Sequence, residues 1–307
     1  MSPPNPRAPL SPVLRPPFFP TVASGPAATL GRWQIGSLLH EGSFASIHPA
    51  RAAGSDAAPW SHVIKRLHGD VLDHPAAVDM LIREAIVGSQ VRHPHLSTVV
   101  DGQLDTAPYF IVLPRLAGAT LSRSIAAAGP LKLPIALWIA RQVAEALSAL
   151  HNQRWLHADV KPDNIMVGPD GHATLIDLGL VRRLEQPGSA VERASVAGTC
   201  GYLAPEVIRS ASGFGVPSDL YSLGATLYEM LSGEPPYCGC TLAEIATAQR
   251  LTSPRAVDEL NPDVPASASE LIHQLLAPDP LRRPSTAEEV VRRLVALEIA
   301  TLSQQVA

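Results

Sequence analysis

The chain of 307 residues has little cysteine, few aromatic residues and little net charge. Three cysteines are too few for a disulfide framework and are typical of a reducing compartment. A formal net charge of −4 at pH 7 gives no general electrostatic attraction to nucleic acid or to an anionic membrane. The most apolar helical stretch, residues 135–150, contains Arg141, Gln142 and Glu145, which indicates an amphipathic core helix. We therefore expect a cytoplasmic protein with neither nucleic-acid nor membrane partners.

Proline, by contrast, is abundant near the N-terminus. Residues 1–28 are crowded with it, and proline lacks the backbone N–H that helices and central strands use. This composition predicts a disordered or polyproline-like tail. A proline-binding module is one partner for such a tail, although a flexible extension without a partner is the simpler interpretation.

From residue 33 onward the pattern is that of a folded domain. Short strands are expected at residues 33–39, 44–50, 61–67, 96–102 and 109–113, with a helix at residues 75–91. Helices are expected at residues 134–152, 220–231, 270–276 and 286–302. These elements predict a small β-rich lobe, a larger helical lobe and a ligand cleft between them.

The clearest chemistry lies in residues 157–164 and at Asp177. Asp159, Asn164 and Asp177 carry oxygen at fixed offsets, and Lys161 lies between the first two. Phosphoryl transfer needs such a set: a carboxylate for a hydroxyl proton, hard oxygen ligands for Mg²⁺ and a cation near the transferred phosphate. A single loop aspartate is usually a turn former, but the combined spacing is that of a kinase catalytic loop. The chain therefore resembles the serine/threonine protein kinases over residues 29–299.

The resemblance implies a bilobal α+β protein-kinase fold over residues 29–302. It places the N-lobe at residues 29–113, the hinge at 114–118 and the C-lobe at 119–302. It also implies transfer of the γ-phosphoryl group of ATP to protein serine or threonine, with Mg²⁺ or Mn²⁺ as the metal. The short loops resemble those of bacterial members of the family.

The family also assigns roles to the catalytic residues by position. Asp159 matches the residue that accepts or orients the proton of the substrate hydroxyl, and Lys161 matches the lysine placed against the γ-phosphate. Asn164 and Asp177 match the metal ligands.

Lys65 ends an expected strand and matches the lysine that holds the α- and β-phosphates. Glu84, in the first long helix, is its expected ion-pair partner. Outside this context both would be ordinary surface charges. Val63 stands where the family usually has an alanine over adenine, which predicts a tighter base pocket.

The position of the glycine-rich phosphate loop keeps only one of its glycines. Gly42 remains, while His40 and Ala45 replace the outer glycines that let backbone amides approach phosphate. This change puts the nucleotide affinity in doubt. The residues at this position are Leu39, His40, Glu41, Gly42, Ser43, Phe44, Ala45, Ser46 and Ile47.

The expected hinge begins after Leu113, which resembles the gatekeeper residue. Family hinges offer adenine a backbone carbonyl and a backbone N–H two residues apart. Pro114 still has its carbonyl and Leu116 its N–H, so a proline is compatible with this role.

Residues 198–206 resemble the end of a serine/threonine kinase activation segment. The resemblance implies a buried ion pair between Glu206 and Arg283. It also implies that Asp219 holds the backbone of the catalytic loop.

Two departures concern regulation and packing. Ala158 replaces the arginine that in many kinases binds a phosphorylated loop residue, so we expect control by other means than loop phosphorylation. Gly88, four residues after Glu84, replaces a large apolar side chain behind Asp177. Glycine there costs roughly 1 kcal/mol relative to alanine and predicts unfilled packing and a loosely held helix.

Two other functions stay open at this point. A pseudokinase that acts as a scaffold is motivated by His40, Ala45, Val63 and Gly88, and is opposed by the complete catalytic set. A small-molecule phosphotransferase would share that set but would lack the protein-substrate platform of residues 198–206.

Overall fold

The computed structural model describes residues 28–54, 58–71, 74–185, 201–210, 213–239 and 241–306. The expected proline-rich tail therefore lies outside the described residues except for Ala28. Residues 186–200, which include the first part of residues 198–206, also lie outside them.

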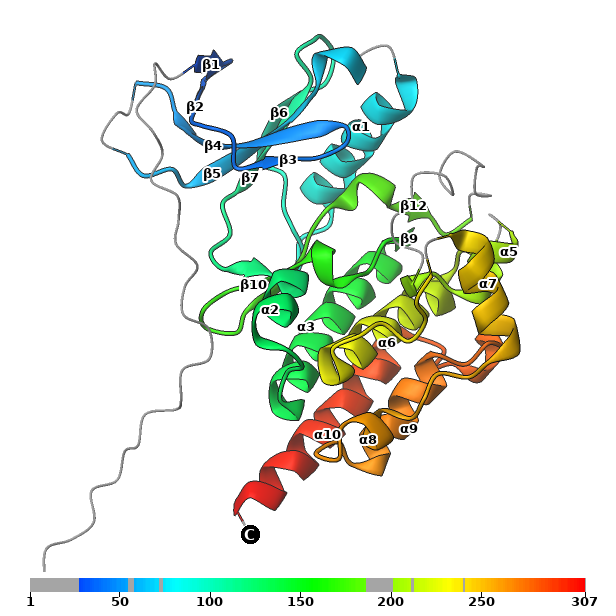
Figure 1. Cartoon of the computed structure of the whole chain (residues 1–307). Coiled ribbons are helices and arrows are strands. Elements are labelled where there is room, and N and C mark those ends of the chain that lie inside the picture. Colours follow the sequence, from blue (N-terminus) through cyan, green and yellow to red (C-terminus); the bar gives the residue numbers. More distant parts are fainter. Residues whose placement is uncertain are drawn as a thin grey trace, which may run out of the picture.

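A curled antiparallel sheet forms the smaller lobe (Figure 1). β3 pairs with β4, and the other strands follow the order β1-β2-β4-β5-β7-β6. The strands are β1 Ala28–Leu30, β2 Trp33–Ile35, β3 His40–Glu41, β4 Ala45–Ala52, β5 His62–Leu67, β6 Asp101–Gln103 and β7 Phe110–Pro114. Successive side chains of β7 pack on opposite faces, because Ile111 joins a cluster with Leu81 of α1 and Val112 joins one with Trp33. Helix α1 therefore covers one face of the sheet.

Helix α1 (Pro75–Gln90) begins at a proline, whose fixed φ suits the first helical turn. Its buried positions include Leu81 and Glu84. The helix also contacts the short 3-10 helix η3 (Leu178–Leu180), which belongs to the other lobe. This contact brings the buried Glu84 next to the chain around Asp177.

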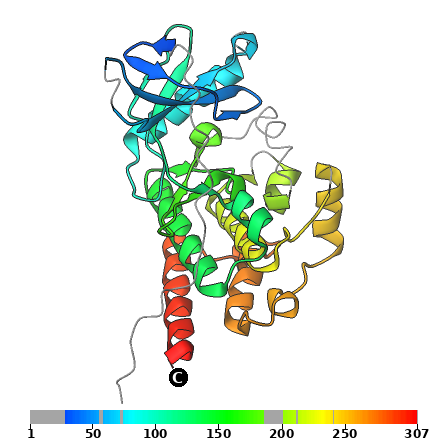
Figure 2. The same cartoon turned by 60° about the vertical axis from the view of Figure 1, so that its left-hand side comes forward.

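The larger lobe is helical, and α3 and α6 lie at its centre (Figure 2). Its helices are α2 Leu121–Ala128, α3 Leu133–Asn152, α5 Pro205–Arg209, α6 Val216–Ser232, α7 Leu242–Leu251, α8 Val257–Leu260, α9 Ala266–Leu275 and α10 Ala287–Val306. Helix α10 runs antiparallel along α3, because Glu298 contacts Arg141 and Glu288 contacts Ser148. The expected bilobal α+β architecture is confirmed.

Short strands and 3-10 helices complete the two lobes. A hairpin of β10 (Ile165–Val167) and β11 (Ala173–Leu175) pairs Ile165 with Leu175, and its open end carries Asn164 and Asp177. The other short elements are β8 Ala119–Thr120, β9 Trp155–Leu156, β12 Arg182–Arg183, η1 Gly69–Val71, η2 Pro162–Asn164 and η6 Pro280–Arg282.

Among the described residues, α3 is the one helix long and apolar enough to cross a membrane by length and composition. Its most apolar window has a mean hydropathy of 1.3, and 61% of that window is buried inside the protein. This burial agrees with the expectation of a core helix.

Two expected strands have other boundaries. The strand expected at residues 33–39 ends at Ile35 as β2, and β3 begins only at His40. Both strands pair with β4. Most of the strand expected at residues 96–102 leaves the N-lobe sheet. Ser97 donates its N–H to Leu175 O over 2.9 Å, so this segment pairs with β11 of the other lobe. An apolar run does not show which partner strand it will meet, and here the partner is distant in sequence.

The expectation of unfilled packing at Gly88 is wrong. Gly88 is buried, and its carbonyl accepts a hydrogen bond from Val99 N over 3.0 Å. A Cβ added at Gly88 would lie 2.7 Å from Val99 Cγ2 and 3.1 Å from Val99 N. The glycine therefore allows the chain after α1 to pack directly on the helix.

Gly88→Ala should lower stability despite the better helix propensity of alanine. The gain of roughly 1 kcal/mol in propensity opposes an overpacking cost of about 1–3 kcal/mol, so a net loss on the order of 1 kcal/mol is expected. Thermal unfolding midpoints measure it. The exposed neighbour offers a control, Ser89→Ala, which should change stability by less than about 0.5 kcal/mol. An unchanged or higher midpoint for Gly88→Ala would contradict the close contact.

Candidate active site

A buried carboxylate of α6 binds the backbone of the catalytic loop. Asp219 accepts the N–H groups of His157 over 2.9 Å and of Ala158 over 2.8 Å, and it also contacts His151 over 2.8 Å. Burial alone would raise the pKa of Asp219, but the hydrogen bond and charge of His151 more than offset it, so the pKa is lowered. Ala158 has a φ of 65°, a left-handed conformation that a non-glycine residue adopts only when its surroundings enforce it. The two bonds to Asp219 supply that constraint.

Asp159 is buried at the centre of this loop. The amide nitrogen of Asn164 donates to Asp159 O over 2.9 Å and to Asp159 Oδ2 over 2.7 Å. Lys161 Nζ lies 2.8 Å from the same Oδ2. Burial raises the pKa of Asp159, and the charge of Lys161 opposes that rise. Oδ1 is buried without a hydrogen-bond partner in the described part of the chain, so it remains as an acceptor.

A second charged group crosses from the sheet to the helical lobe. Lys65 Nζ of β5 lies 2.7 Å from Glu84 Oε2 and 2.8 Å from Asp177 Oδ1. Burial alone would lower the pKa of Lys65. The charges of Asp177 and Glu84 raise the pKa by more than burial lowers it, so the lysine stays charged. The charge of Lys65 lowers the pKa of Asp177 to about 2. The ion pair expected between Lys65 and Glu84 is present, and Asp177 extends it.

Asn164 and Asp177 lie close together because Asn164 O accepts Ile176 N over 2.8 Å at the end of the hairpin. The nitrogen of the Asn164 amide is used on Asp159, which leaves its oxygen for a cation. Asp177 Oδ1 binds Lys65, which leaves Asp177 Oδ2 for the same cation. Within the described ranges no cluster of three or more His, Cys, Asp or Glu side chains forms a metal cage. Two oxygen ligands completed by phosphates and water fit Mg²⁺, which is rarely held in an all-protein cage.

Comparison with known families agrees with this geometry. The protein kinase domain family matches residues 33–295, which span both lobes and every site residue described above. The chain belongs to the protein kinase family. Members of this family use ATP and a divalent metal, typically Mg²⁺.

The curated relatives of this kinase domain include bacterial serine/threonine-protein kinases. It is 31% identical over 271 residues to the serine/threonine-protein kinase PknB of Mycobacterium leprae, which covers 86% of this chain and 42% of the relative. It is 32% identical over 272 residues to PknB of Mycolicibacterium smegmatis, with coverage of 86% and 42%. It is 31% identical over 260 residues to PrkC of Bacillus subtilis, with coverage of 85% and 39%. The chain thus spans about two fifths of the length of these relatives.

The nucleotide end of the kinase cleft is a tight turn and an extended hinge. Gly42 N donates to Ala45 O over 2.9 Å, and a Cβ at Gly42 would approach that oxygen to 3.2 Å, so the remaining glycine suits the turn. In the hinge, Arg115 N donates to Ser61 O over 2.9 Å. Because groups alternate along an extended chain, the Pro114 carbonyl and the Leu116 N–H point the other way, as adenine binding requires.

Leu39 lies directly before β3, and the other expected residues of the glycine loop lie on β3, on β4 and in the turn between them. Ala45 and Ser46 are buried, while Phe44 is 41% exposed. Val63 pairs with Leu113 across β5 and β7, so both expected base-pocket residues lie on neighbouring strands.

A buried bridge fixes the substrate side of the kinase domain. Arg283 binds both carboxylate oxygens of Glu206 over 2.6 and 2.8 Å, as the resemblance implied. It also donates to Pro217 O and Ala277 O, both over 2.8 Å. The sequence does not predict the two carbonyl contacts, because backbone acceptors leave no mark in a sequence motif. It does not predict the contact between His151 and Asp219 either, because these side chains are 68 positions apart.

Proposed function

We propose that this protein is a serine/threonine protein kinase that transfers the γ-phosphoryl group of ATP to hydroxyl groups of protein substrates. The observation that carries the proposal is the arrangement around Asp159: one oxygen is fixed by Asn164 and Lys161, and the other is left as an acceptor. A fixed carboxylate with one open oxygen is suited to orient a substrate hydroxyl and to take its proton.

Each neighbouring charge has a place in this reaction. Lys161 lies beside Asp159 and can stabilise negative charge on the transferred group, while Lys65 is held by Glu84 for the α- and β-phosphates. Asn164 and Asp177 would hold Mg²⁺, which supplies charge neutralisation at the phosphates when bound. Asp219 keeps the catalytic loop in its left-handed turn at Ala158.

Mass spectrometry of the full chain and a general protein substrate tests this function. Incubation with ATP and Mg²⁺ should produce phosphoserine or phosphothreonine, and a metal chelator should prevent it. Nucleotide binding without protein phosphorylation would favour the scaffold function, for which the single glycine of the phosphate loop is the motivation.

We also propose that phosphorylation of the activation loop is not the main on-switch. Ala158 is buried and has no side chain that could bind a phosphate. Ser189 and Ser195, which lie outside the described residues, are the loop serines to replace. The double variant Ser189→Ala, Ser195→Ala should keep the rate of peptide phosphorylation within about threefold of the wild type. The reason is that the chain has alanine at position 158, in place of the arginine that would bind a phosphate on the loop. A near-total loss of the rate of peptide phosphorylation would contradict this proposal.

A further inference from the structure

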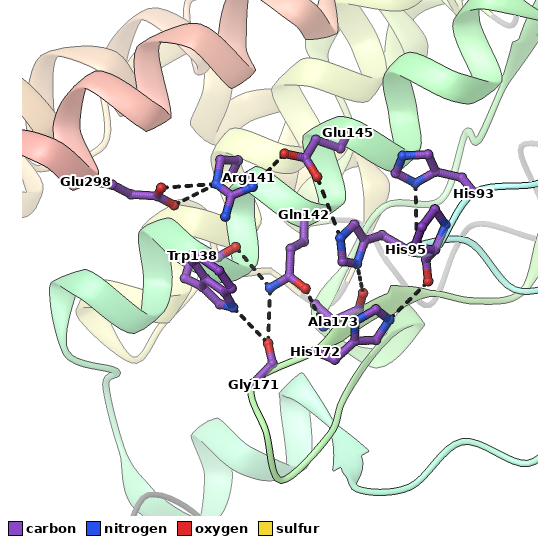
Figure 3. Close-up of polar contacts among 11 residues, drawn as sticks. His93, His95, Trp138, Arg141, Gln142, Glu145, Gly171, His172, Ala173 and Glu298 are labelled. Atoms are coloured by element: carbon purple, nitrogen blue, oxygen red, sulfur yellow. Dashed lines mark hydrogen bonds and ion pairs between the residues drawn. The ribbon is translucent and has the colours of Figure 1, made fainter. Parts of the chain in front are cut away.

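Three histidines gather where the loop after α1 meets the hairpin of β10 and β11 (Figure 3). His93 and His95 come from the loop after α1, and His172 comes from the turn between β10 and β11. The ring centroids are 5.5 Å apart for His93 and His95, and 4.6 Å apart for His95 and His172. We call these three residues the histidine joint.

The joint fastens the loop after α1 to β11. His95 Nδ1 donates to Ala173 O over 2.8 Å, and His95 O accepts Leu175 N over 2.9 Å. The loop thus connects the helix that carries Glu84 to the strand that ends two residues before Asp177. Glu84 and Asp177 both bind Lys65, so the spacing of their elements bears on the active site.

The hydrogen bond to Ala173 decides the tautomer of His95. A carbonyl oxygen only accepts hydrogen bonds, so Nδ1 must carry the hydrogen. Nε2 of the neutral ring then carries a lone pair and is an acceptor. Nε2 lies 3.6 Å from Glu145 Oε2, beyond hydrogen-bond range, as expected for two acceptors that face each other. A proton on Nε2 would turn this contact into an ion pair.

Glu145 is already committed to another partner. Its Oε1 lies 2.6 Å from Arg141, which also binds both oxygens of Glu298 on α10 over 3.0 Å (Figure 3). Arg141 in turn lies 4.5 Å from the centre of the Trp138 ring. Glu145 thus has one oxygen on Arg141 and the other facing His95, which places the joint next to the contact between α3 and α10.

The other two rings have hydrogen bonds of their own. His93 Nδ1 accepts His95 N over 3.3 Å, so protonation there removes an acceptor. His172 Nε2 donates to Pro94 O over 3.0 Å, and its backbone N–H donates to Asp170 Oδ1 over 3.0 Å. Charging His95 therefore places a cation beside two other imidazoles, with Glu145 as the acid that faces it and Arg141 on the other side of Glu145.

Burial lowers the pKa of His93 and of His95. At His95 the hydrogen bond to Ala173 and the charge of Glu145 oppose this fall, the neighbouring histidines add to it, and the pKa remains lowered. The sign of the effect on stability follows from this direction. When the pH falls below about 6.5, the unfolded chain binds protons that the folded joint resists, so folding stability is lost. Above that pH neither state is protonated and the joint is intact.

We propose that His95 is a positioning residue that couples the active site to pH: acidification loosens the loop after α1 from β11 and lowers phosphoryl transfer. The effect on transfer rests on the proposed kinase function. The effect on the joint does not, and it is measured separately below.

His95→Asn tests the proposal in the full chain. The Asn amide can replace the Nδ1–H donor toward Ala173 O but does not titrate. The kcat and the KM for ATP are measured between about pH 8 and pH 5.5. At pH 8 the variant should lie within about threefold of the wild type, and at pH 5.5 the wild type should have lost at least about threefold more activity than the variant. Parallel profiles would overturn the proposal.

His48→Asn is the matched control. His48 Nδ1 also contacts a backbone carbonyl, Gly36 O over 3.1 Å, but His48 lies on β4 outside the joint. Its pH profile should follow the wild type. His172→Gln keeps a donor toward Pro94 O and removes one imidazole, so it should reduce the loss of activity at acid pH. This variant replaces His95→Asn in the test if His95→Asn does not fold.

Thermal unfolding over the same pH range gives a readout without activity. The unfolding midpoint of the wild type should fall more with acid than that of His95→Asn or His172→Gln. Superimposed midpoint profiles would overturn the histidine joint. A protein that is inactive at every pH but shows the His95-dependent loss of midpoint would overturn the kinase function and support the joint.

Discussion

Asp159→Asn should lower the kcat for protein phosphorylation by about 10²- to 10⁴-fold, the range that a positioned general base contributes. Asparagine fills the same volume and retains an oxygen for Asn164, so the loop should keep its shape. It loses the carboxylate that can take the proton of the substrate hydroxyl. The KM for ATP should stay within about threefold, because Asp159 lies on the hydroxyl side of the reaction.

Steady-state kinetics with a peptide substrate measure this change. Asp105→Asn provides the same chemical change at an exposed loop position and should leave kcat unaltered. Equal rates for Asp159→Asn and the wild type would show that Asp159 is not the residue that orients or deprotonates the hydroxyl.

Arg283→Met should produce the largest loss of stability, about 3–5 kcal/mol, which is the usual cost of removing one partner of a buried ion pair. The Arg283 side chain is fully buried, and the Glu206 side chain is 17% exposed. Methionine would leave the Glu206 carboxylate and the carbonyls of Pro217 and Ala277 without their donor. The thermal unfolding midpoint should fall on the order of 10 °C.

The neighbouring arginine provides a matched control. Arg282 lies 3.9 Å from Asp279, and its side chain is 81% exposed. Exposed pairs of this kind contribute roughly 0–1 kcal/mol, so Arg282→Met should shift the midpoint little. Similar shifts for the two variants would contradict the assignment of the bridge to Arg283.

The catalytic loop could be predicted from the sequence because its chemistry is local. Asp159, Lys161 and Asn164 follow one another within six positions. The turn that presents them depends in addition on Asp219 of α6, which lies far along the chain. The bond between Lys65 and Asp177 could not be predicted in the same way. It joins residues 112 positions apart, and it depends on how α1 and η3 pack.

The misassigned elements have the same cause. Residues 96–102 have the pattern of an N-lobe strand, but only the end of this run joins that sheet, and Ser97 pairs with Leu175 of β11. The gap expected at Gly88 is filled by Val99, which approaches from that same segment. In both places the sequence did not show which segment would pack against the residue. Tertiary contact, and not local propensity, decides such positions.

Transfer of label from γ-labelled ATP by the full chain tests the central claim most directly. With Mg²⁺ and a protein substrate, the wild type should place label in phosphoserine or phosphothreonine, while Asp159→Asn should bind labelled nucleotide equally and transfer almost none. Label in protein from both would contradict the role of Asp159. Nucleotide bound by both with label transferred by neither would contradict the claim that this site is a phosphotransferase.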